Sequence, residues 1–245
     1  MNGHAALRTA RCAAALALAA LCGCGENAGD GDKPGESRTD GPLVLVVTGE
    51  NPTYSYIEKD TGEVEGIEIE LARAAAASLG RDLAVKVVAF EELLPLVKSG
   101  KADMASSCLS ITEGRKRSVD FSIPYETDGG VFLYRTGEQE PTMILAESMR
   151  VATIESSSHD FYLARHGIDP LRARSCSNAV RDLLDGKIDA LYYDGCTMKA
   201  EAAKSGGLLS VSRFETREHY GFALPKGRAD LKEAIDAAIA ERKKK

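Results

Sequence analysis

The chain has 245 residues, a formal charge of −6 at pH 7, 44% hydrophobic residues, 6% aromatic residues and no Trp. These proportions are typical of a globular protein and argue against a fibrous or disordered chain. The length suffices for one large or two small cores. The acidic balance argues against a nucleic-acid partner, because such a partner needs clustered Lys and Arg.

The first 23 residues have the pattern of a signal peptide. They contain no acidic residue, and Arg8 and Arg11 precede an apolar run at 12–22. As a helix that run would extend only about 16 Å, short of the roughly 30 Å hydrocarbon core of a bilayer. Residues 21–24, Leu-Cys-Gly-Cys, resemble the bacterial lipoprotein box, which implies that Cys24 is the lipidated mature N-terminus. An ordinary secreted protein with a coincidental Cys at this point is the alternative.

Residues 24–42 form the predicted tether. They are rich in Gly, Pro and acidic residues and contain no large apolar side chain, so they cannot bury a core. As a flexible coil the segment would reach roughly 25 Å. We therefore expect a folded body held by its lipid at the periplasmic or extracellular face of the cell membrane.

Removal of the signal peptide and lipidation of Cys24 would leave three cysteines, Cys108, Cys176 and Cys196. Cys176 is predicted to end one strand and Cys196 to follow the next. A disulfide between them is one possibility in an oxidising compartment, and buried free thiols are the other. No cysteine pair has CxxC spacing and the four His are scattered, so we predict no metal site and no cofactor.

Strand-like and helical runs alternate from residue 43 onward. The first alternation has predicted strands at 43–49, 83–90 and 102–110 and helices at 66–80 and 90–100, a βαβαβ pattern with a parallel sheet. The second has strands at 150–156, 171–176 and 188–194 and helices at 157–167, 177–187 and 196–207. The fold class is therefore α/β with two sheet-and-helix units.

Extended segments at 131–142 and 219–227 flank the second alternation and are the predicted crossings between the units. Lobe 1 is then expected over 43–133 and 219–245, and lobe 2 over 134–218. Because α/β sheets bind ligands at the carboxyl ends of their strands, we expect a ligand cleft between the lobes.

Polar side chains stand at three predicted strand ends. Ser110 precedes Arg115, whose guanidinium matches a carboxylate, although a basic surface turn is the alternative. Ser157 and Ser158 stand at a predicted helix N-terminus, which favours an anion, or else simply cap that helix. Asp194 could accept hydrogen bonds from an ammonium group or cap the following helix. Together these groups suit a zwitterion.

Two aromatic residues could provide flat walls for a ligand side chain. They are Tyr54, in the segment TGENPTYSYIE, and Phe90, at the start of FEELLPL. Either could equally be a core aromatic.

The segment SSCLSITEGRKRSVDFSIPY at 106–125 resembles a pattern of the extracellular solute-binding proteins of polar amino-acid ABC importers, solute-binding family 3. Similar segments are PTYS (52–55), VEGIEIELA (64–72), LVKSGKAD (96–103), DALYYD (189–194) and YGFALPKG (220–227), so the likeness covers about 43–240. It implies a two-lobed periplasmic-binding-protein-like fold of type II. It also implies a monomer without catalytic activity that closes on one L-α-amino acid and delivers it to a membrane permease.

The resemblance also implies roles for single residues. Arg115 would clamp the ligand carboxylate with Ser110 beside it, and Ser157 and Ser158 would contribute from the second lobe. Asp194 would bind the ammonium group, with Cys108 contacting it through its backbone. Tyr54 and Phe90 would sandwich the ligand side chain. Asn51 lies where members that prefer cationic ligands often have an acid, which weakens a Lys or Arg assignment, although the neighbouring Glu50, Glu155 and Asp160 keep it open.

Two features depart from the family pattern. Ser156 replaces a customary Gly in the anion-binding loop, and Lys245 ends the sequence without the usual terminal helix, so we expect a less stable body. A cyclohexadienyl (prephenate or arogenate) dehydratase on the same scaffold is the rival prediction, with Glu155 or Asp194 as general acid. A sensor or regulatory domain has no support in the sequence.

Overall fold

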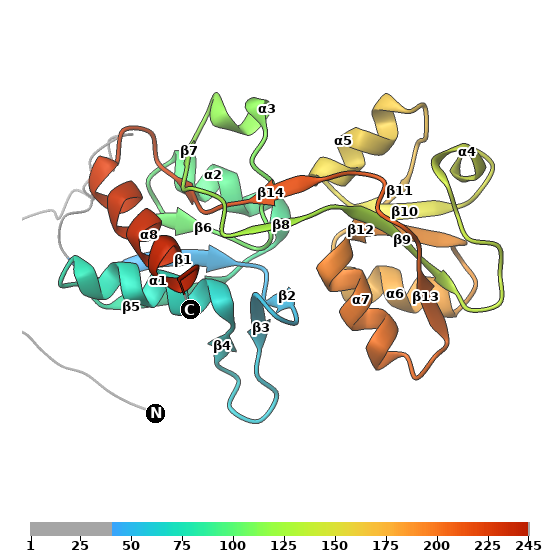
Figure 1. Ribbon diagram of the computed structural model, residues 1–245, viewed down its shortest axis with the longest axis horizontal. Coiled ribbons are helices and arrows are strands. Elements are labelled where there is room, and N and C mark those ends of the chain that lie inside the picture. The colour runs from blue at the N-terminus through green and yellow to red at the C-terminus, as the bar shows by residue number, and fades with distance from the viewer. Residues whose placement is uncertain (1–40, 245) are drawn as a thin grey trace, which may run out of the picture. The chain divides into compact units, whose positions relative to one another are not determined.

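The computed structural model describes residues 41–244, which form two α/β units built on separate five-stranded sheets (Figure 1). The predicted signal peptide, the predicted lipidation site Cys24 and most of the predicted tether lie outside the described residues, as does Lys245. Between residues 41 and 244, no helix has the length and apolar character needed to cross a membrane.

The first sheet has the strand order β5-β1-β6-β15-β7. Its central part is parallel, since β1 pairs in parallel with β5 and β6, while β15 is antiparallel to β6 and β7. The bounds are β1 (Leu43–Val47), β5 (Leu83–Val87), β6 (Met104–Ala105), β7 (Asp120–Phe121) and β15 (Ala223–Leu224). The chain therefore returns near its C-terminus to complete the first sheet.

Helices cover both faces of this sheet, and the side chains of β1 alternate between them, as the period of two in a strand requires. Leu43 and Leu45 pack with α1 (Ile67–Ser78) and α8 (Ala229–Arg242), which lie side by side (Figure 1). Val44 and Val46 pack on the other face, with residues of α2 (Leu93–Lys98). The strand predicted at 43–49 and the crossover helix predicted at 66–80 are confirmed.

The second sheet has the order β11-β10-β12-β9-β13, in which β10 is parallel to β11 and β12, and β9 is antiparallel to both of its neighbours. Residues of α6 pack on one face and residues of α4 and α5 on the other. The strands are β9 (Gly130–Arg135), β10 (Val151–Ile154), β11 (Leu171–Ala173), β12 (Ala190–Asp194) and β13 (Leu209–Val211). The helices are α4 (Met143–Ala146), α5 (Ser158–Arg165), α6 (Cys176–Leu184) and α7 (Gly195–Lys204).

Two antiparallel strands, β8 (Glu126–Asp128) and β14 (Glu218–Tyr220), connect the two units (Figure 1). The chain is tightly packed where these strands enter the second unit. A Cβ on Gly129, directly after β8, would lie 1.9 Å from the backbone oxygen of Thr216, two residues before β14. The return crossing lies where the sequence predicted it. The outgoing crossing precedes the predicted segment 131–142, because Val131, Phe132 and Leu133 are fully buried within the second sheet.

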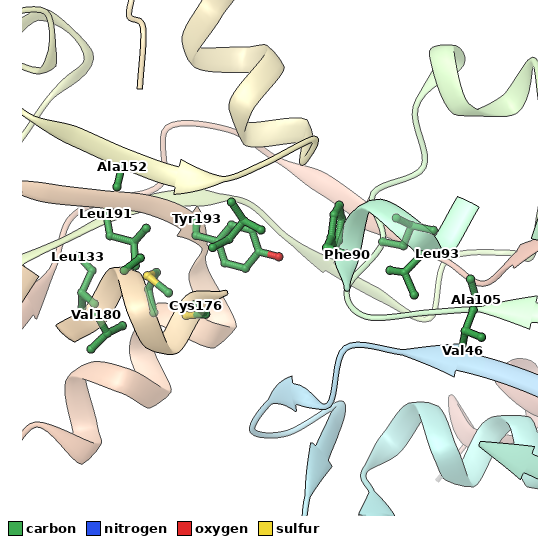
Figure 2. Packing of buried hydrophobic residues seen from close by; sticks show 14 of the residues in the cluster. Val46, Phe90, Leu93, Ala105, Leu133, Ala152, Cys176, Val180, Leu191 and Tyr193 are labelled. Atoms are coloured by element: carbon green, nitrogen blue, oxygen red, sulfur yellow. The ribbon is translucent and has the colours of Figure 1, made fainter. Parts of the chain in front are cut away.

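The hydrophobic core continues from one unit to the other. Figure 2 shows Tyr193, from β12, turned toward Phe90, from the short 3₁₀ helix η1 (Phe90–Glu92) of the first unit. On the second-sheet side, Leu191 and Val180 belong to the same buried cluster. Apolar packing thus reaches the junction where polar groups of both units meet.

Several short elements were not predicted from the sequence. They are β2 (Glu50–Asn51), β3 (Ser55–Ile57) and β4 (Val64–Glu65), which form a small antiparallel sheet, and α3 (Glu113–Lys116). Cys176 begins α6 rather than ending a strand, because the Ser175 side chain caps that helix by accepting a hydrogen bond from the Asn178 backbone N–H. Elements this short carry no periodic signal.

Candidate functional site

The Arg115 guanidinium is held in place by its own loop. Thr112 caps α3 by accepting a hydrogen bond from the Arg115 backbone N–H, and Arg115 Nη1 donates to the Ser110 carbonyl oxygen at 2.9 Å. The Phe90 ring centre lies 5.7 Å from the guanidinium carbon. Burial lowers the pKa of Arg115, and the nearby Glu218 carboxylate opposes that effect. Within residues 41–244 the guanidinium makes no other hydrogen bond, so the rest of its fork can meet an anion.

The Glu218 carboxylate gathers hydroxyl groups from both units. Its Oε2 accepts hydrogen bonds from Ser110 Oγ at 2.5 Å and from Ser158 Oγ at 2.8 Å, and Oε1 accepts from Thr216 Oγ1 at 3.1 Å. Burial opposes ionisation, but His159 and the donated hydroxyl hydrogen bonds bring the pKa of Glu218 below its ordinary value. A carboxylate is therefore stabilised at the point where Ser110 and Ser158 converge.

His159 is buried between two carboxylates. Its Nε2 lies 2.9 Å from Asp194 Oδ1 and its Nδ1 lies 3.3 Å from Glu218 Oε1. Burial alone would lower the pKa of His159, but Asp194 and Glu218 together raise it above the usual range, against a smaller opposing effect of Arg115. The two carboxylates thus favour the protonated form of His159, whose ring lies between Asp194 at the end of β12 and Glu218 in the crossing strand β14.

Asp194 ends β12 and is buried. Burial raises the pKa of Asp194, and the hydrogen bonds with His159 and Tyr220 oppose that rise. Both of these groups contact Oδ1, with the Tyr220 hydroxyl donating at 2.5 Å. Oδ2 makes no hydrogen bond with any described residue, which leaves one carboxylate oxygen for a further donor.

Two hollows adjoin this cluster. The Arg115 groove, of about 940 Å³, is lined by residues that include Phe90, Ser110, Arg115, Ser158, Phe161 and Glu218. The Asn51 cavity, of about 150 Å³, is lined by residues that include Glu50, Asn51, Phe90, Cys176, Tyr193 and Thr197. Both receive side chains from both units, and Phe90 lines both.

Asn51 is buried with half of its hydrogen-bonding capacity unused. Its Nδ2 donates to Cys108 Sγ at 2.8 Å and to Thr197 Oγ1 at 3.0 Å, while Oδ1 has no partner among the described residues. Beside it, Glu50 Oε2 accepts a hydrogen bond from the Cys176 backbone N–H at 3.1 Å. A buried acceptor without a donor is costly, so Asn51 Oδ1 would be stabilised by an N–H or O–H donor.

Most of the sequence-predicted residues lie together. Arg115, Ser110, Ser158 and Phe90 line the Arg115 groove, Asn51 lines its own cavity, and Cys108 and Asp194 are buried close by. Ser157 caps α5, accepting a hydrogen bond from the Asp160 backbone N–H at 3.1 Å. Tyr54 lines neither hollow: its ring packs 5.9 Å from that of Tyr125 in the first core, and its hydroxyl donates to Glu126.

The backbone at Ser156 has a conformation that Gly adopts more readily than other residues. Its φ of +62° lies in the left-handed region, and its backbone N–H donates to Asp160 Oδ2 at 3.2 Å. A non-glycine residue holds this conformation at a cost in free energy.

The sequence did not reveal His159, Glu218 or Tyr220 as site residues. His159 directly follows Ser158, but its two carboxylate partners are distant in sequence, and no local spacing indicates that they meet. Between residues 41 and 244, no cluster of three or more His, Cys, Asp or Glu could hold a metal ion.

Residues 43–245 match the model of the bacterial extracellular solute-binding proteins, family 3. The L-cystine-binding protein TcyJ of Escherichia coli (strain K12) is 29% identical over 210 residues, covering 83% of this chain and 78% of the relative. The L-arginine-binding protein of Pseudomonas aeruginosa is 26% identical over 214 residues, covering 82% of each chain. The ABC transporter glutamine-binding protein GlnH of Bacillus subtilis (strain 168) is 24% identical over 242 residues, covering 93% and 89%.

Solved structures are similar over most of their length. Holo ArgBP from T. maritima superposes with a TM-score of 0.78 at 29% identity, covering 83% of this chain and 91% of that chain. An ancestral arginine-binding protein bound to arginine has a TM-score of 0.78 at 27% identity, covering 84% and 94%. The predicted two-lobed α/β fold is confirmed.

The raised pKa of His159 predicts a pH-dependent contribution to stability. Its folded pKa exceeds the unfolded value of about 6.5, so the stabilisation is complete below that pH and is lost as the pH rises through the folded pKa. His159→Asn should lower the free energy of unfolding by about 3–5 kcal/mol at pH 6, because it leaves buried carboxylates unpaired. The cost should be smaller at pH 9, as measured by urea unfolding.

His166→Asn is the matched control, since this exposed His directly follows α5. It should cost less than about 0.5 kcal/mol at either pH. A cost for His159→Asn that is equal at the two pH values, or larger at pH 9, would contradict an ionised His159.

Proposed function

The chain belongs to the bacterial extracellular solute-binding proteins, family 3, and we propose that its solute is one L-α-amino acid. The protein would act as a monomer, bind this amino acid between its two lobes and deliver it to the permease of an ABC importer. Relatives named for binding cystine, glutamine, histidine and arginine support this class of ligand. The lobes are proposed to divide at β8 and β14, close to the predicted ranges 43–133 with 219–245 and 134–218.

The observation that carries the proposal is the convergence of the Ser110 and Ser158 hydroxyls on the Glu218 carboxylate, in the groove that the Arg115 guanidinium also lines. A ligand carboxylate would take over these donors while Glu218 moves aside. Because Ser110 and Ser158 come from different units, an anion held by both favours the closed arrangement. Ser157 would act indirectly, by capping α5 and presenting its N-terminus to the same anion.

Asp194 Oδ2 is the proposed acceptor for the ligand ammonium group, with the Cys108 backbone beside it. The opposite oxygen, Oδ1, is fixed by His159 and Tyr220, so the carboxylate has a defined orientation. In an α-amino acid the two charged groups share one carbon. A site for the pair therefore needs Arg115 and Asp194 on adjoining walls.

The Asn51 cavity is the proposed site for the ligand side chain. Glu50 and Asn51 line it and would supply the acceptors, and Phe90 would be its flat wall. The chemistry favours a side chain with N–H donors, such as an amide, an imidazole or a guanidinium. Tyr54 lies behind this region in the core and would support the site without touching the ligand.

Arg115→Ala should weaken binding by about 2–5 kcal/mol, or roughly 30-fold or more, because the ligand carboxylate would lose its cation in a desolvated site. Isothermal titration of the full chain with the amino acid selected by a thermal-shift screen of the twenty L-amino acids measures this loss. Lys116→Ala, an exposed change on the same segment that lines neither hollow, should leave the affinity unchanged.

An unchanged affinity for Arg115→Ala would refute the proposed site.

The same thermal-shift screen includes prephenate and arogenate, the substrates of the rival dehydratase prediction. The raised pKa of Asp194, caused mainly by burial, is a property that a general acid needs. We nevertheless propose no catalysis, because Asp194 Oδ1 is engaged by His159 and Tyr220, and turnover of either compound would contradict this.

Asn51→Asp should shift the ratio of affinities toward a cationic ligand. A carboxylate at this position forms charge-assisted hydrogen bonds with a guanidinium, which are roughly twice as strong as neutral ones. We expect arginine to gain about tenfold relative to glutamine in isothermal titration. Asn178→Asp, the same change at an exposed position of α6, should leave the ratio unaltered, and an unaltered ratio for Asn51→Asp would exclude this cavity as the side-chain site.

We also propose that residues 1–23 are a lipoprotein signal peptide, that Cys24 carries the lipid, and that residues 24–42 form the tether. The sequence pattern supports this anchor. Radioactive fatty acid should label the protein in bacterial cells, and Cys24→Ser should abolish the label while Cys22→Ser retains it. Equal labelling of both variants would refute the assignment.

A further inference from the structure

Two thiols from opposite units face each other beside the candidate site. Cys108 follows β6 of the first unit, Cys196 is the second residue of α7 in the second, and their sulfur atoms lie 3.7 Å apart. The alternative that the sequence left open paired Cys196 with Cys176. Cys176 is buried at the start of α6, and no described thiol contacts it.

The surroundings hold both thiols in position. Cys108 has a φ of +49°, its backbone N–H donates to Glu68 Oε1 at 2.8 Å, and its sulfur accepts a hydrogen bond from Asn51. The Cys196 sulfur lies 3.8 Å from Thr197 Oγ1. A disulfide has an S–S length of about 2.05 Å, so a shift of less than about 2 Å would bring the sulfurs to bonding distance.

We propose that Cys108 and Cys196 form a dithiol site that reacts with low-molecular-weight disulfides and becomes a disulfide joining the two units. The extracellular solute-binding family works where disulfides form and persist. Cys108 is buried and Cys196 is partly exposed, so one of the two thiols can be reached from solvent.

The reaction is thiol–disulfide exchange in two steps. Cys196, the more exposed thiol, loses its proton and attacks one sulfur of the small disulfide, forming a mixed disulfide and releasing one small thiol. The Cys108 sulfur then displaces the second small thiol, forming the Cys108–Cys196 bond. Two protein thiols are oxidised and one small disulfide is reduced to two thiols. Burial raises the pKa of Cys108, which keeps its reactive thiolate scarce and makes the exchange slow.

The bond would fix the two units in their closed arrangement. Cys108 accepts the hydrogen bond from Asn51, and Cys196 lies two residues beyond Asp194, so the link crosses the site itself. A closed, cross-linked receptor could neither admit nor release a ligand. This consequence rests on the proposed function, whereas the formation of the disulfide does not.

A non-reducing peptide map of the full chain tests the disulfide directly. The protein is treated with oxidised glutathione, its free thiols are blocked, and it is cleaved with trypsin. We expect the peptides 102–115 and 188–199, which contain Cys108 and Cys196, to be joined. The peptide 175–181 with Cys176, and the peptide 12–38 with the three N-terminal cysteines, should not be joined to either.

The same oxidation in urea is the control, and there the pairings should spread over all cysteines. Absence of the 102–115 to 188–199 link in the folded protein, or equal linking through Cys176, would overturn the proposal. Cys108→Ser and Cys196→Ser should each abolish the link, and Cys176→Ser should preserve it. A cross-linked protein should also melt several degrees above the reduced one, because the bond constrains the unfolded chain.

The rate of ligand association distinguishes a failure of the disulfide proposal from a failure of the proposed amino-acid binding. Cross-linked protein should lose at least tenfold in the rate of ligand association and recover it on reduction, as followed by stopped-flow fluorescence. Unchanged association would overturn the closure. Reduced protein that binds no amino acid would count against the proposed function alone, since the peptide map decides the disulfide independently.

Discussion

The buried contact of His159 with two carboxylates is the interaction on which the rest of the site depends. Asp194 comes from the second sheet and Glu218 from the strand that returns to the first unit, and the His159 ring lies between them. Three ionisable groups can be buried together only if their charges are paired. This pairing fixes Asp194 at the carboxyl end of β12 and directs the Glu218 carboxylate toward Ser110 and Ser158.

In the proposed site, this arrangement would couple ligand binding to the contact between the two units. Ser110 belongs to the first unit and Ser158 to the second, and both donate to the same carboxylate oxygen. Tyr220, on the second crossing strand, donates to Asp194. A ligand that replaces Glu218 on the two serines would therefore act at the point where the crossing strands and both units meet.

The sequence predicted the features that depend on local periodicity. The buried alternation of β1 and the helix over 66–80, which ends at Gly80, indicated the first sheet and its crossover, and the strand ends indicated Arg115 and Asp194. It could not predict that Val131–Leu133 would pair within the second sheet, because a short apolar run indicates an extended segment but not the strands with which it pairs. Nor could it place His159 beside Glu218, or Cys196 beside Cys108, because such contacts join distant residues.

A crystal structure of the protein with the amino acid that stabilises it most would show directly where the ligand carboxylate binds. We expect this carboxylate within about 3 Å of the Arg115 guanidinium and of the Ser110 and Ser158 hydroxyls, with Glu218 displaced from both serines. We also expect the ligand ammonium on Asp194 Oδ2. A ligand carboxylate bound elsewhere, with Glu218 still accepting both hydroxyl hydrogen bonds, would refute the proposed site.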